Sequence, residues 1–75
     1  MKLKKLLKRF IPQGTPLTLH LINGDKTEDT LTCHAFAVEP SYPDWLELHV
    51  LQISIEHNAL DIVVTKVKNE AEKIN

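Results

Sequence analysis

The sequence predicts an α+β fold: an N-terminal amphipathic helix packed on a four-stranded, mainly antiparallel sheet. Two observations lead to this class. Apolar residues recur with helical spacing over the first eleven positions, and from residue 17 the spacing changes to the two-residue period of strands. We expect the sheet within 17–67 and a polar tail over 68–75. The whole chain, residues 1–75, is expected to form one domain.

The helix is expected over residues 1–11. Its apolar side chains fall at i, i+3, i+4, i+7 and i+8 and make one stripe, while the remaining positions after Met1 are basic. The stripe consists of Leu3, Leu6, Leu7, Phe10 and Ile11. Pro12 ends the helix at or just before Ile11, because the residue before a proline is disfavoured in the α conformation.

The first two strands are predicted from the alternation that begins at Leu17. Leucines at every second position give a half-buried strand over 17–22, and the dipeptide Asn23-Gly24 starts a turn within the polar stretch 23–29. A second strand is expected over about 30–38. Apolar groups lie on both of its faces, so we expect this strand to be central in the sheet or covered on both sides.

An irregular, proline-rich crossover follows at 39–45. Its two prolines, three residues apart, exclude a central strand. The segment has room for one helical turn around 41–46. We therefore expect the chain to cross here from one hairpin to the next.

The last two strands are expected over 46–56 and 60–67, joined by a hairpin turn at 57–59. The apolar phase of the third strand changes near Val50-Leu51, which a β-bulge would explain. A strongly bent third strand would also suit a small Sm-like β-barrel. The open sheet and the barrel therefore both agree with the sequence.

The charges are unevenly distributed along the chain. Five of the nine Lys and Arg residues lie within the first nine positions, where no acid occurs, so residues 10–75 carry four positive and ten negative charges. A basic helix thus precedes an acidic body. The acidic body argues against a broad interface with a polyanion.

The small size of the chain favours self-association. A domain of 75 residues buries a modest share of its surface, and the single cysteine, Cys33, excludes an intrachain disulfide. A homo-oligomer would supply the missing stability. No apolar run is long enough to span a membrane and no signal-peptide pattern follows the basic start, so we expect a cytoplasmic protein.

The sequence contains no pattern typical of an enzyme. It has no phosphate-binding glycine loop, no nucleophile elbow and no zinc-protease motif. His20 and His34 could face each other if the first hairpin were centred near residue 27, and could then bind a metal with a carboxylate. Solvent-facing histidines on a sheet are the favoured interpretation. We expect no catalytic residue, no metal and no cofactor.

Two groups of residues are the candidate binding sites. The basic residues Lys4, Lys5, Lys8 and Arg9 would contact an anionic partner, whereas a solvated helix face is the structural alternative. Tyr42 and Trp45, in the proline-bounded crossover, would supply aromatic contacts. The alternative for Trp45 is a role in covering the end of the core. His20 and His34 are weaker additions to this set.

Three segments resemble small proteins encoded by phages and mobile elements of Gram-positive bacteria. They are the basic start Met1–Leu7, the segment Ile11–Leu17, and the pattern that runs from Val50 to Val64. The resemblance implies an accessory protein that acts by binding, for example in counter-defence. It differs in the middle of the chain, where this sequence has Tyr42-Pro-Asp-Trp45 and a longer acidic loop.

These observations predict a non-enzymatic, self-associating module that acts by binding. It would block a host protein or sequester a small anionic, nucleotide-like ligand at a subunit interface. The alternative function is a small nucleic-acid-binding protein that uses the basic helix.

Overall fold

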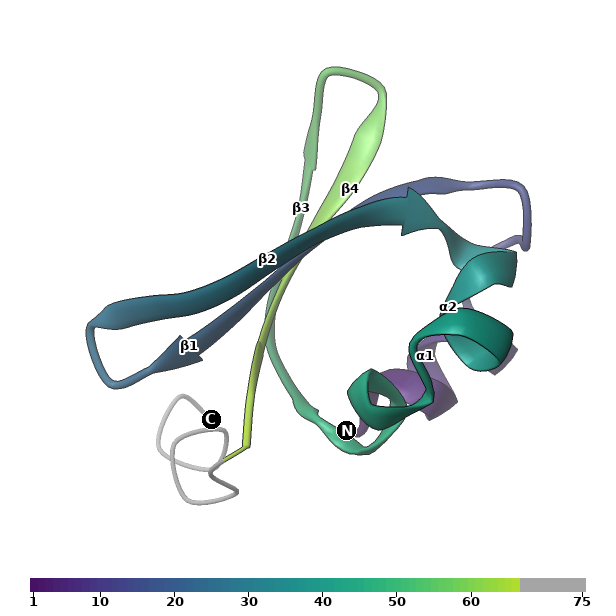
Figure 1. Cartoon of the computed structure of the whole chain (residues 1–75). Coiled ribbons are helices and arrows are strands. Elements are labelled where there is room, and N and C mark those ends of the chain that lie inside the picture. Colours follow the sequence, from purple (N-terminus) through teal and green to yellow (C-terminus); the bar gives the residue numbers. More distant parts are fainter. Residues whose placement is uncertain (67–75) are drawn as a thin grey trace.

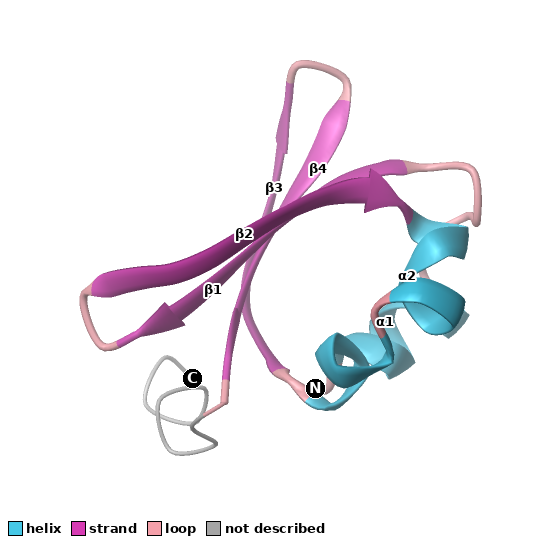
Figure 2. Ribbon diagram, in the orientation of Figure 1, coloured by secondary structure: helices cyan, strands magenta, loops and turns pink. Residues whose placement is uncertain are grey.

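The computed structural model describes residues 1–66 as two α-helices, one 3₁₀-helix and four strands (Figures 1 and 2). In chain order they are α1 (Leu3–Arg9), β1 (Pro16–Asn23), β2 (Lys26–His34), α2 (Ala35–Ser41), the 3₁₀-helix η1 (Pro43–Glu47), β3 (His49–Glu56) and β4 (Ala59–Thr65). The predicted tail, 68–75, lies outside the described residues.

The four strands form one open sheet with the order β2-β1-β4-β3. The central pair, β1 and β4, is parallel, and the two outer pairings are antiparallel. The predicted α+β class is therefore confirmed. The barrel alternative is wrong, because within residues 1–66 the sheet ends at β2 and β3 and these two strands do not pair with each other.

The sheet is strongly twisted and curves around the helices, which gather on its concave side (Figure 1). Leucines at alternate positions of β1 point to this side and are buried, as the period of two predicts. They meet side chains of both helices in one core. The buried apolar residues are Leu3, Leu6, Ile11, Leu17, Leu19, Leu21, Ala35, Val38, Leu48, Ile62 and Val64.

The N-terminal segment is tied to the start of β3. The Leu3 N–H donates to the Leu48 carbonyl and the Val50 N–H donates to the Met1 carbonyl, both at 2.8 Å. Lys2 and His49 form an isolated antiparallel bridge. Helix α1 thus begins beside β3, the strand at one edge of the sheet. Its apolar stripe was predicted to include Phe10, but this ring is exposed because the helix ends at Arg9.

The largest difference from the predicted elements concerns the second strand. The chain turns already at Gly24, whose φ of +64° suits a glycine, and β2 begins at Lys26. The polar residues 26–29 belong to this strand, whereas Ala35–Ser41 form helix α2. Ala35 and Val38 are three residues apart and both buried. This is the spacing of one helix face, and it occurs within the residues 30–38 whose alternation indicated a strand.

The second hairpin agrees more closely with the sequence-based expectations. The register of β3 and β4 shifts between Val50 and Gln52, which confirms the predicted bulge. His57 and Asn58, both with positive φ, form the turn that was predicted at 57–59. The expected helical turn around 41–46 is present as η1, and β3 consequently begins at His49 rather than at residue 46.

Candidate functional site

An open groove of about 780 Å³ lies between α1, α2 and the segment that leaves α1. It combines basic, aromatic and aliphatic side chains. Its lining residues are Lys4, Leu7, Lys8, Arg9, Phe10, Ile11, Pro12, Gln13, Ala35, Phe36, Glu39 and Leu46. We refer to this feature as the α1–α2 groove.

Backbone hydrogen bonds hold one end of the groove in place. The Phe36 N–H donates to the Gln13 carbonyl at 3.0 Å, and the Ala35 N–H donates to the Thr15 carbonyl at 2.9 Å. These bonds attach the segment after α1 to the first turn of α2. Buried Ile11 and Ala35 lie at the same place, so the groove rests on the core.

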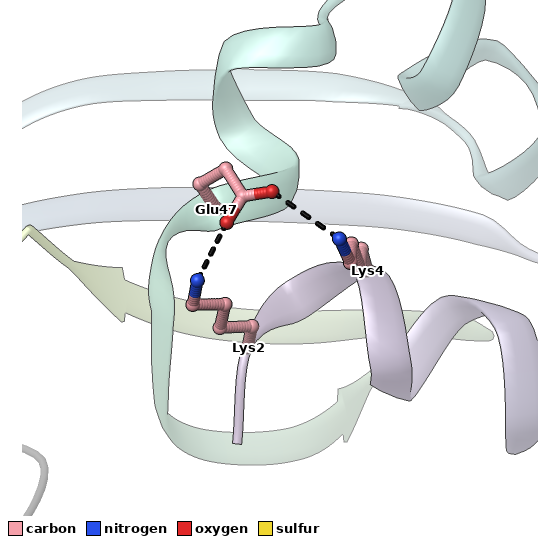
Figure 3. Close-up of polar contacts among 3 residues, drawn as sticks. All are labelled: Lys2, Lys4 and Glu47. Atoms are coloured by element: carbon pink, nitrogen blue, oxygen red, sulfur yellow. Dashed lines mark hydrogen bonds and ion pairs between the residues drawn. The ribbon is translucent and has the colours of Figure 1, made fainter.

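Helix α1 contributes the positive charge of the groove. Lys8 and Arg9 are in its last turn, where cations interact favourably with the negative end of the helix dipole. Within the described residues neither of these two side chains forms an ion pair. Lys4 differs, because its ammonium lies 3.4 Å from a carboxylate oxygen of Glu47, which also binds Lys2 at 2.7 Å (Figure 3).

Two exposed aromatic rings contribute the apolar part of the groove. Phe10 is 63% exposed and Phe36 is 58% exposed, which is unusual for side chains of this size. The His34 ring stacks on Phe36 with 5.5 Å between the ring centroids and 20° between their planes. His34 therefore adjoins a lining residue of the groove. Glu39, on α2, is the one acidic side chain of the lining.

The structure brings together some of the predicted binding residues and separates others. Lys4, Lys8 and Arg9 line the groove, but Lys5 does not. Tyr42 and Trp45 also lie outside it. Trp45 is half-buried and packs against the core, which agrees with its structural interpretation, whereas Tyr42 is exposed beside η1.

His20 and His34 do not face each other, because the first hairpin is not centred near residue 27. The turn at Gly24 places His20 opposite Thr30 and His34 opposite Pro16, so the two rings lie at different positions along the hairpin. His20 instead has a carboxylate neighbour that the sequence did not indicate: its Nε2 is 3.6 Å from an oxygen of Asp61. The parallel pairing of β1 with β4 creates this contact on the convex face.

Among residues 1–66, no three His, Cys, Asp or Glu side chains are placed to hold a metal ion. Burial raises the pKa of the Cys33 thiol, which therefore stays protonated at neutral pH. The described helices are also too short to cross a membrane.

Sequence reasoning missed the aromatic side of the groove. Phe10 fitted the apolar stripe of α1, and Phe36 fitted the expected second strand, so neither was distinguishable from a core residue. Comparison with known proteins adds no further assignment, since no protein family, curated protein or solved structure matches this chain.

Proposed function

We propose that the chain is a non-enzymatic binding module that holds a small anionic, nucleotide-like ligand in the α1–α2 groove. One observation carries this proposal: two cations that form no ion pair within residues 1–66 and two exposed aromatic rings line the same groove. Lys8 and Arg9 suit a phosphate, to which guanidinium and ammonium groups donate charge-assisted hydrogen bonds. Phe10 and Phe36 suit a planar base, because bases stack on aromatic side chains.

The size of the groove supports a small ligand. Its volume of about 780 Å³ falls within the range of roughly 300–1,000 Å³ typical of small-molecule sites. The groove is open to solvent, and a chain of 75 residues has little material with which to enclose a ligand. Self-association, which would add stability to a domain of this size, belongs to the same proposal.

The proposed binding would serve an accessory role. In the setting that the resemblance to phage and mobile-element proteins implies, a cytoplasmic protein of this kind sequesters a nucleotide signal. It could equally occupy a host protein through the same basic surface. The chemistry of the groove favours the small ligand, because its aromatic rings and its cations lie side by side within one volume.

Titration of ¹⁵N-labelled protein with a nucleoside monophosphate, a cyclic dinucleotide and inorganic phosphate tests this function. We expect chemical-shift changes at the groove residues with both nucleotides. Lys8→Glu should weaken nucleotide binding by about tenfold or more, because it replaces a cation that binds phosphate with an anion that repels it. Lys5→Glu is the matched control: it makes the same charge change on the same helix, outside the groove. Absence of binding to all three anions would contradict the proposal.

A second variant separates base stacking from charge. Phe36→Ala should weaken nucleotide binding and leave the weaker binding of inorganic phosphate unchanged, since phosphate has no ring to stack. Oligonucleotides test the alternative function. Tight binding of DNA or RNA with a steep salt dependence, reduced equally by Lys5→Glu and Lys8→Glu, would favour a nucleic-acid-binding protein instead.

A further inference from the structure

The two edges of the sheet differ in their chemistry. Strand β2 carries charged side chains at Lys26, Glu28 and Asp29, and such charges discourage pairing with another chain. Strand β3 has no lysine and no proline, and its residues 50–55 are uncharged. Within β3, Ile53 is 46% exposed and Ile55 is 79% exposed. An uncharged edge with exposed isoleucines is typical of an interface.

The first part of the β3 edge is already covered by the chain's own N-terminal segment. Met1 accepts a hydrogen bond from Val50, and Lys2 bridges to His49. This contact ends at the bulge between Val50 and Gln52. Within residues 1–66, the part of the edge with no neighbouring strand is therefore the stretch 51–56, at the end of β3 that is distant from the helices (Figure 1).

The turn determines which backbone groups this open stretch offers. A two-residue turn is closed by a hydrogen-bonded pair, which here is Glu56 and Ala59. In an antiparallel ladder the backbone groups of alternate residues point toward the partner strand and away from it. Ser54 and Glu56 therefore direct their N–H and C=O groups toward β4. Those of Ile53 and Ile55 point to the open edge.

We infer that two copies of this chain pair through β3, antiparallel, about a twofold axis at Ser54. In this register Ile53 lies opposite Ile55 of the second copy and Ile55 lies opposite Ile53. All four isoleucines are on the concave face of a continuous eight-stranded sheet, and their outward-pointing backbone groups form the new hydrogen bonds. Ser54 lies opposite itself on the convex face. The inference names the surface for the self-association in the proposed function and rests on that part of it.

A second copy suits this edge because the edge is complementary to itself. In this register, side chains that lie opposite each other are on the same face of the sheet. The residues that form hydrogen bonds between the two copies are Ile53 and Ile55, whose backbone groups point to the open edge. The acidic β2 edge lies at the far side of the sheet, so pairing through β3 keeps the negative charges of the two copies apart. The pairing also ends where Met1 covers the strand.

Analytical ultracentrifugation of the full chain over a range of concentrations tests the interface. We expect a monomer–dimer equilibrium. Ile55→Lys should weaken it by about tenfold or more, because the substitution places a like charge in both copies of the contact. Thr30→Lys, which adds the same charge at an exposed position of β2, should leave it unchanged. A monomer at all concentrations, or equal effects of the two variants, would overturn the inference.

Crosslinking tests the register without disturbing the isoleucines. In a Cys33→Ser background, Ser54→Cys places two thiols opposite each other in a non-hydrogen-bonded pair, where a disulfide forms readily. We expect a covalent dimer under mild oxidation, and little from Thr32→Cys on β2. Thr32→Cys crosslinking more than Ser54→Cys would overturn the register. The nucleotide titration is a separate measurement, because no β3 residue lines the α1–α2 groove, so failure of either proposal is distinguishable.

Discussion

Glu47 is the residue at which the basic helix meets the rest of the chain. Its carboxylate accepts hydrogen bonds from Lys2 at 2.7 Å and from Lys4 at 3.4 Å, which fastens the start of α1 to the end of η1 (Figure 3). All three side chains are about half exposed, so solvent screens these ion pairs. They occupy Lys2, which directly precedes α1, and Lys4 in its first turn, whereas Lys8 and Arg9 form no ion pair with any side chain of residues 1–66.

The pKa of Glu47 provides a prediction at this scale. The hydrogen bond from Lys2, followed by that from Lys4, lowers the pKa of the carboxyl below its ordinary value of 4.5. Because the pKa is lower in the folded state than in the unfolded state, the ion pair stabilises the fold at pH values above the ordinary pKa of the carboxyl. This stabilisation is lost as the pH falls through the lowered pKa. An NMR titration should show the low pKa, and Lys2→Ala should raise it more than Lys4→Ala. An equal or opposite ranking of the two variants would contradict this reading.

At the scale of elements, the sequence predicted those whose period is unambiguous. Helix α1, strand β1, the bulge in β3 and its turn were all expected from spacing or turn residues. Helix α2 was not expected in place of the end of the second strand, because residues 35–38 fit both periods and only packing decides between them. The groove was accordingly half predicted. Its cations come from α1, while Phe36 depends on a helix that the alternation concealed.

The turn between β3 and β4 allows a prediction about one element. Asn58 has a φ of +64°, a conformation that costs less for glycine than for any residue with a Cβ. Asn58→Gly completes a favoured two-residue hairpin turn and should raise the free energy of unfolding by a few tenths to about 1 kcal/mol. Chemical denaturation measures the change. His57→Pro is the contrasting variant, since proline cannot adopt the positive φ of residue 57, and it should destabilise the hairpin.

At the scale of the whole molecule, one layer of helices and one sheet share a single small core. Leu19 is at its centre, fully buried, between Leu31 on β2 and Ile62 on β4. The free energy of unfolding of such small domains is low. The charges are also separated in space, with the basic groove on the helices and the acidic turn of the first hairpin at the opposite end of the sheet (Figure 1).

Truncation of this core side chain should therefore unfold most of the population. Leu19→Ala is expected to cost about 2–5 kcal/mol, which is comparable with the total stability of a small domain. Phe36→Ala, the removal of a larger but exposed side chain, should change stability little. Circular dichroism during thermal and urea unfolding compares the two. A smaller loss for Leu19→Ala than for Phe36→Ala would show that the core lies elsewhere.

The parallel pairing of β1 with β4 also has a consequence for how the chain folds. Each hairpin joins neighbouring segments and can form early, but neither alone covers the leucines of β1. The pairing that completes the sheet joins Leu17 to Leu60, more than forty positions away in the sequence. Such distant contacts slow folding. During synthesis, β1 consequently has one neighbouring strand, β2, until β4 has left the ribosome. For that interval the apolar face of β1 is accessible to chaperones.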